Sequence, residues 1–295
     1  MSRKIAKRFL LLLGISLLFL TGCQQHANLE STAMSQNVSI NIGEQGAAFA
    51  KRYPDKIRVI HQPVGADFYK IDWDVHPRGM VVIDHGAYSF TIEDVLGVSG
   101  YQNLDGFENE GLTEFNIYSG ITAPDLIPHD EARQKMHVIL QRILQAGWKI
   151  NITRSMPRLR GKDALNYAFI DGYTSLDASY IPTFEEWMRI ESRTAWRFYA
   201  DHVYLSVNFT REHTLTDPTK PGSYLVSFNL TSENAFYRGY IDGEGENHKN
   251  WKTLLPAELA KLVPVRAEVE AKLRAQGIKI DETYQDPPLP DLGGK

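Results

Sequence analysis

The sequence predicts an α+β fold in which a largely antiparallel sheet is packed by a few helices. Apolar residues alternate along segments 203–210 and 224–230, which is typical of antiparallel strands with one covered face. A third segment, 129–146, carries apolar residues at helical spacing. The 295-residue chain has enough material for one large domain or two small ones.

A series of short strand-like segments precedes the expected helix. They are rich in β-branched and aromatic residues, and turn residues such as the Asp105-Gly106 pair lie between them. The expected strands cover 57–60, 68–73, 79–83, 88–92 and 115–118.

The clearest helix is expected between Pro128 and Gly147. Acidic residues follow Pro128, at the positive end of the helix dipole, and Gly147 can take the left-handed conformation that ends helices. A strand is expected at 148–152, and a Thr183–Glu186 capping box predicts a short helix. The apolar face of the long helix comprises Met136, Ile139, Leu140, Ile143 and Leu144.

The last part of the chain is expected to hold a helix over 265–276 and then a strand at 278–280. This order repeats that of the earlier helix and its strand, so the sequence leaves open two related halves. The connection 211–222 is long for a hairpin, which favours a functional loop.

Residues 1–22 have the layout of a secretory signal peptide. A positively charged stretch precedes an apolar run from Phe9 to Leu20, and small residues follow it. The apolar run is too short for a transmembrane helix, which needs about 20 residues. The positive residues are Arg3, Lys4, Lys7 and Arg8.

The segment Leu20-Thr21-Gly22-Cys23 resembles the lipobox of bacterial type II signal peptides. This resemblance covers residues 1–23 and implies cleavage before Cys23, a diacylglycerol on its thiol and an acyl chain such as palmitate on the new amine. It also implies an outer-membrane lipoprotein facing the periplasm, because Gln24 replaces the Asp that retains such proteins at the inner membrane. Two or three acyl chains anchor a protein stably.

The remainder is expected to form three parts. Residues 23–48 are rich in Gln, Asn, Ser and Ala and predict an acylated Cys followed by a flexible tether. Residues 49–284 form the α+β globular domain, in which an internal division near 155–180 is left open. Residues 285–295, rich in Pro and Gly, form an extended tail.

Charge and cysteine content exclude several classes of function. The leader holds four of the 32 basic residues and none of the 36 acidic ones, so the mature chain has a formal charge of −8. Nucleic acid is therefore not expected as a partner. Cys23 is the single cysteine, so the folded part has no disulfide, thiolate metal site or Cys nucleophile, and no cofactor is expected besides the lipid.

Asp72, Asp74 and His76 form a D-x-D-x-H pattern. On a strand these residues share a face and offer oxygen and imidazole ligands that suit Zn²⁺ or Mn²⁺. A solvated edge strand is the favoured explanation, because no second ligand pair follows. A hydrolase site would have to combine these residues with Asp84, His85 and Ser99.

Two groups of residues are candidates for binding. Arg154, Arg158, Arg160 and Lys162 form a basic stretch that suits an acidic partner or phosphate, although a solvated loop is favoured. Aromatic and arginine side chains, typical of interface hot spots and of ordinary amphipathic helices, occur near position 190. The candidate protein-contact residues are Trp187, Arg193, His202, Tyr204, Arg211 and His213.

Three functions are compatible with these observations. The favoured one is a membrane-tethered periplasmic protein that binds a protein partner. In general plan the chain is similar to the immunity lipoproteins that accompany type VI secretion phospholipases, which implies capture of a toxic effector. The alternatives are a structural lipoprotein of an envelope or secretion assembly and an envelope hydrolase.

Overall fold

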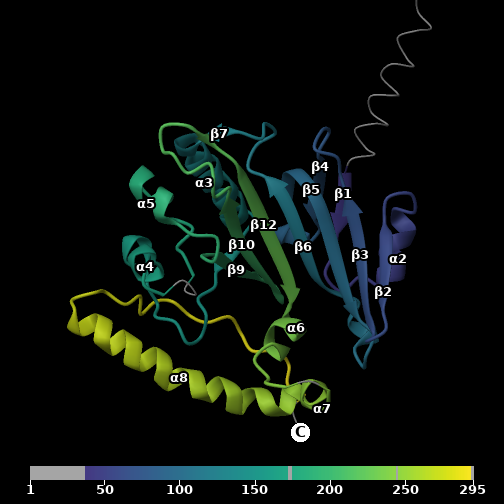
Figure 1. Cartoon of the computed structure of the whole chain (residues 1–295). Helices are drawn as coiled ribbons and strands as arrows, with labels where there is room; N and C mark the ends of the chain where they lie inside the picture. Colours follow the sequence, from purple (N-terminus) through teal and green to yellow (C-terminus); the bar gives the residue numbers. More distant parts are fainter. Residues whose placement is uncertain (1–36, 172–174, 244, 294–295) are drawn as a thin grey trace, which may run out of the picture. The chain divides into compact units, whose positions relative to one another are not determined.

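The computed structural model describes residues 37–171, 175–243 and 245–293. Residues Ser39–Lys295 form one compact unit, which contains nearly all of the described helices and strands (Figure 1). The signal peptide, Cys23 and the tether up to residue 36 lie outside the described residues.

A run of strands fills most of the first part of the described chain and most helices follow it, with two single 3-10 turns at Gly86–Tyr88 and Glu108–Glu110. The strands are β1 (Asn37–Ile40), β2 (Arg58–Gln62), β3 (Ala66–Asp72), β4 (Gly79–Ile83), β5 (Phe90–Asn103), β6 (Leu112–Gly120), β7 (Ile127–Pro128), β8 (Lys149–Ile150), β9 (Trp196–Ala200), β10 (Val203–Arg211), β11 (Pro221–Gly222) and β12 (Tyr224–Ser232). The helices are α2 (Gly46–Arg52), α3 (His129–Gln145), α4 (Gly161–Ala168), α5 (Phe184–Arg189), α6 (Glu233–Arg238), α7 (Glu246–Lys249) and α8 (Trp251–Ala275).

One large sheet organises the fold, and this confirms the predicted α+β class. Its strands follow the order β1-β4-β5-β6-β12-β10-β9-β8, and β3 joins β5 and carries β2 (Figure 1). The pairings from β2 to β12 are antiparallel. A separate two-stranded ladder of β7 and β11 links the start of α3 to the long connection after β10.

The two faces of the sheet differ in the way that the alternation predicts. Val207 and Phe209 of β10 and Phe228 of β12 are buried on one face, and the α5 side chain Trp187 stacks on Phe209 with 4.3 Å between ring centroids. On the other face four polar residues form a row across β5, β6, β12 and β10, because each lies directly opposite the next in the strand register. The row consists of Ser99, Asn116, Asn229 and Ser206.

Helix α3 and the α5 capping box confirm the sequence predictions. Met136, Leu140 and Ile143 are buried on one face of α3, and Gly147 adopts φ +91° directly after the helix. The Thr183 side chain accepts a hydrogen bond from the Glu186 backbone, and the Glu186 carboxylate accepts one from the Thr183 backbone. These local signals are strong because each depends on neighbouring residues alone.

The predicted C-terminal elements are wrong in two respects. Helix α8 begins at Trp251, fourteen residues before the expected start, and includes Pro256 and Pro264. Residues 278–280 form no strand; instead Ile280 packs with Leu273 of α8 in a small apolar cluster. The similarity that suggested two related halves therefore has no structural counterpart.

The predicted domain boundaries also need correction. Residues 37–48 are not part of a tether, because Ile40 is buried in β1 and Gly46 begins α2. The division near 155–180 is absent, since Ser39–Lys295 is one compact unit that includes α4. Residues 285–293 hold no helix or strand, and they lie against the domain, where the Pro287 carbonyl accepts a hydrogen bond from Arg154 at 2.8 Å.

Candidate functional site

An open groove of about 670 Å³ lies where β10 ends and the connection 212–220 begins. We call it the loop groove. The end of α4, the end of α5 and the connection form its walls. Its lining residues are Phe169, Met188, Arg189, Ile190, Glu191, Ser192, Arg211, His213 and Thr216.

Arg211 is held in the groove by the end of α5. Its Nη1 donates to the Met188 carbonyl at 3.1 Å and its Nη2 donates to the Trp187 carbonyl at 3.0 Å. These are carbonyls of the last helical turn, which lack the regular helical partners; that of Trp187 also accepts a hydrogen bond from the Ile190 N–H at 3.1 Å. The Nε atom donates to the Tyr224 hydroxyl at 3.2 Å. Three of the five guanidinium N–H groups are thus occupied, which leaves two for a ligand.

Arg189 supplies a second cation to the groove. Its guanidinium lies 4.0 Å from the centre of the Phe169 ring, in a cation–π contact. Neither Arg189 nor Arg211 forms an ion pair with a carboxylate of the described residues. The groove carboxylate Glu191 is bonded at 3.1 Å to Arg193 instead. The loop groove therefore presents two guanidinium groups without an ion-pair partner among the described residues.

A buried polar network supports the groove from below. The Tyr224 hydroxyl accepts hydrogen bonds from Arg211 and from the Trp187 indole, both at 3.2 Å, and contacts Nδ1 of His129. Because the hydroxyl already accepts two bonds, its own proton points to His129, whose Nδ1 must then be unprotonated. Burial, together with the charge of Arg211, lowers the pKa of His129, which agrees with a neutral ring.

The predicted contact residues do not all reach this groove. Arg211 and His213 line it, and Arg193 pairs with a lining residue on its rim. His202 lies elsewhere, in the two-residue turn between β9 and β10, where positive φ angles at Asp201 and His202 match a tight hairpin turn. His202 is therefore at the tip of a hairpin, not on a strand face.

Two of the predicted contact residues are buried, so the prediction that they contact a partner is wrong. Trp187 is 1% exposed and packs on Phe209 of the sheet. Tyr204 is 4% exposed because the α6 side chain Phe236 stacks on it with 3.5 Å between ring centroids. Alternation predicted the polar face for Tyr204, but α6 covers that end of the face. Arg189 belongs to the aromatic and arginine group near position 190, and the end of α5 places it in the groove.

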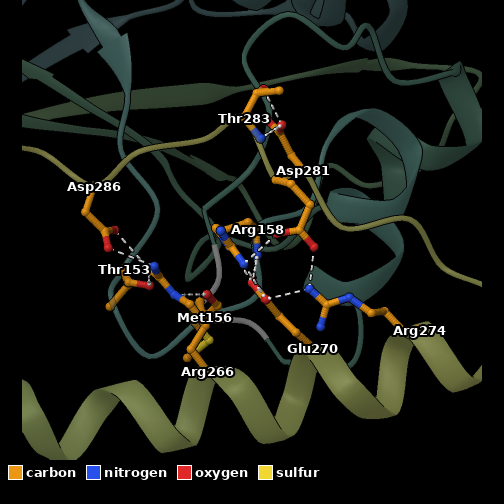
Figure 2. Close-up of polar contacts among 10 residues, drawn as sticks. Thr153, Met156, Arg158, Arg266, Glu270, Arg274, Asp281, Thr283 and Asp286 are labelled. Atoms are coloured by element: carbon orange, nitrogen blue, oxygen red, sulfur yellow. Dashed lines mark hydrogen bonds and ion pairs between the residues drawn. The ribbon is translucent and has the colours of Figure 1, made fainter.

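The basic stretch is neutralised within the chain, so it offers no anion site. Arg158 pairs with Glu270 at 2.7 Å, and Arg274 from the next turn of α8 joins the same carboxylate at 3.3 Å (Figure 2). The remaining pairs link Arg154 to Asp286, Arg160 to Asp281 and Lys162 to Glu186. These carboxylates come mostly from α8 and the segment after it, far away in sequence.

The proposed metal and hydrolase residues do not converge. Asp72 ends β3 and its exposed carboxylate pairs with Arg58 at 3.4 Å, while Asp74 and His76 follow in an exposed connection. Ser99 lies nine residues along β5 from Phe90, which pairs near His85, so roughly 30 Å of strand separates them. Within residues 37–293, apart from the gaps, no group of three or more His, Cys, Asp or Glu residues could hold a metal ion.

Neither a protein-family model nor a curated protein nor a solved structure matches this chain. Among the helices that the structure describes, none has both the length and the apolar character needed to cross a bilayer.

Proposed function

We propose that this protein is a lipid-anchored envelope protein that binds an acidic segment of a protein partner in the loop groove. The supporting observation is the pair of guanidinium groups, Arg189 and Arg211, which share the groove without a carboxylate partner among the described residues. Elsewhere the chain pairs arginines closely with carboxylates, as at Arg158. A planar guanidinium with free N–H groups suits the two oxygens of a carboxylate.

The anchor proposed here is a diacylglycerol on Cys23, with an acyl chain on the new N-terminus, in the outer membrane facing the periplasm. The lipobox Leu20-Thr21-Gly22-Cys23 supports it. In one form of the proposal the partner is a secreted toxic effector and the protein is its immunity protein. Such a protein acts by occupying the effector, which needs a binding surface and no chemistry of its own.

The anchor is tested by metabolic labelling with a fatty-acid analogue and by fractionation. We expect wild type to carry the label and to sediment with membranes, and the Cys23→Ser variant to do neither. An unlabelled wild-type chain, or a serine variant that still sediments, contradicts the anchor.

The partner site is tested by photo-crosslinking in cells. A photoreactive residue replaces the exposed Thr216 on the groove rim or, as a control, the exposed Val64 in the β2–β3 turn. We expect a specific adduct from position 216 that is absent at position 64. Arg189→Glu should abolish that adduct, whereas Arg58→Glu, at an exposed arginine on β2, should leave it unchanged. Equal adducts from both positions, or an adduct that survives Arg189→Glu, contradict the proposal.

A further inference from the structure

A second cavity, separate from the loop groove, lies between α3 and the strands β5 and β6. We call it the α3 cleft. Its volume of about 320 Å³ is at the lower end of the range for small-molecule sites. Apolar side chains from both layers line it, namely Phe90, Ile92, Ile121, Val138, Ile139 and Phe228. Ile139, expected on the buried face of α3, is only half-buried because it faces this cleft.

A β-bulge places two carboxylates at the cleft. Gly79 of β4 pairs with Val95 and Val81 pairs with Ile92, so Glu93 and Asp94 of β5 together lie opposite Met80 alone. Such bulges redirect side chains and are frequent beside functional sites. The backbone at Asp94 has φ +54°, a left-handed conformation that costs a non-glycine residue about 1–2 kcal/mol. The chain thus keeps an aspartate where glycine would be less strained.

The cations around the cleft leave Asp94 without an ion-pair partner among the described residues. Arg142 pairs with Glu93 at 3.3 Å, and Lys135 lies 3.9 Å from Glu131. Arg78, whose charge also acts on Asp94, pairs with Asp125 at 2.6 Å. Each nearby cation therefore has its own carboxylate. The Asp94 carboxylate has neither an ion pair nor a hydrogen bond with any side chain or backbone group that the structure describes.

We propose that the α3 cleft binds a small molecule that carries one ammonium group on an apolar body, with Asp94 as the counter-ion. The apolar lining accepts the body, and the half-buried carboxylate accepts two or more ammonium N–H bonds. An anionic ligand is disfavoured, because it would meet the carboxylate of Asp94 while the cations of the rim already have partners. A neutral apolar ligand would leave the carboxylate partly desolvated without compensation.

The pKa of Asp94 is consistent with this assignment. Burial raises the pKa above its usual value, and the positive charges of Arg78 and Lys135 only partly offset that effect. A bound ammonium group would lower this pKa again. Affinity should therefore decrease at low pH, where the carboxyl group is protonated in the free protein.

Three probes of the same shape test the proposal by calorimetry on the full chain in lipid nanodiscs: phenethylamine, 3-phenylpropionate and 2-phenylethanol. We expect phenethylamine to bind and the acid and the alcohol to bind at least about tenfold more weakly. Asp94→Asn keeps the shape and tolerates positive φ, and it should reduce phenethylamine affinity by about tenfold or more. Asp84→Asn, at an exposed carboxylate directly after β4, should have no effect.

Thermal unfolding separates ligand binding from folding. Asp94→Gly relieves the left-handed strain and should raise the melting temperature while it abolishes binding. The proposal is overturned if the acid or the alcohol binds as tightly as the amine, or if Asp94→Asn retains wild-type affinity. It is also overturned if N-acetyl-lysine methylamide binds and phenethylamine does not, since the cleft would then accept a lysine side chain of a protein.

Discussion

Arg158 and Glu270 form a two-point ion pair that links the segment before α4 to α8. Nε of Arg158 donates to Oε1 of Glu270 at 2.8 Å, and Nη2 donates to Oε2 at 2.7 Å (Figure 2). The Arg158 backbone N–H donates to Oε1 as well, at 3.1 Å. The Glu270 side chain is only 3% exposed, so the pair fixes α8 against a loop more than 100 residues earlier in the chain.

Glu270→Gln is expected to lower the free energy of unfolding by about 3 kcal/mol, because it leaves the largely buried Arg158 guanidinium with only the exposed Glu282, at 3.2 Å, as a counter-charge. Burial favours the neutral carboxyl group, but the hydrogen bonds from Arg158 outweigh it and lower the pKa of Glu270. Urea-induced unfolding at pH 7 measures the change.

Two variants control this prediction. Glu268→Gln removes a carboxylate two residues away that pairs with Lys272 in solvent, and it should have little effect. The double variant Arg158→Met with Glu270→Leu removes both charges and should recover much of the lost stability. If Glu270→Gln and Glu268→Gln are equally harmless, the pair does not fix α8.

The lowered pKa of Asp281 predicts that the free energy of unfolding decreases in acid. Hydrogen bonds from Thr283 and from Arg160 lower its pKa to about 2, whereas an unfolded aspartate has a pKa near 3.9. The stabilisation is therefore complete above pH about 4 and is lost as pH falls through 2; it amounts to about 2 kcal/mol. Chemical unfolding between pH 5 and 2 should show this slope, and Asp281→Asn should flatten it. Asp72→Asn, at an exposed carboxylate, should leave the slope as it is in wild type.

The sequence predicted those elements whose signals are local. Alternation identified β10 and β12, and helical spacing identified α3, because each pattern records which side of one element is buried. The predicted start of the last helix is too late, and the observed helix α8 includes Pro256 and Pro264, a residue type that disfavours helix interiors. Proline removes one N–H from a helix, but packing of Trp251, Leu255 and Leu259 with Tyr237 compensates for that loss.

The candidate sites depend on contacts between distant segments, so the sequence predicted them only in part. Arg211 and His213 were identified by their position at a long connection, and both line the loop groove. The sequence does not predict the role of Asp94. An aspartate inside a strand segment does not indicate that a β-bulge will direct its side chain toward a cleft. The sequence does not show whether Trp187 lies at an interface or in the core, because an indole side chain suits both; in the structure it is buried in the core.

His202 should titrate above its usual range. Its Nδ1 lies 2.8 Å from the buried carboxylate of Glu233, and this hydrogen bond and charge raise the pKa of His202 above 6.5. The stabilisation is complete below pH 6.5 and is lost as pH rises through the folded-state pKa. An NMR titration of the ring protons should show the raised value in wild type. Glu233→Gln should return it to about 6.5, while Glu258→Gln on α8 should not change it; a value at or below 6.5 in wild type would refute the assignment.

Arg211→Lys is expected to lower the free energy of unfolding by about 1–2 kcal/mol. Three aromatic rings surround the guanidinium, those of Trp187, Phe209 and Tyr224, each with its centre within 6 Å. An ammonium group has the same charge, but it cannot reach the two α5 carbonyls and the Tyr224 hydroxyl in one plane. Thermal unfolding checks this, with Arg193→Lys on the exposed rim as a control that should behave as wild type.

Because Arg211 also supplies the free N–H groups of the loop groove, the Arg211→Lys variant should lose partner binding at temperatures where it is still folded. A variant with full stability and reduced binding would mean that the arginine serves the ligand alone, and reduced stability with full binding would mean that it serves α5 alone.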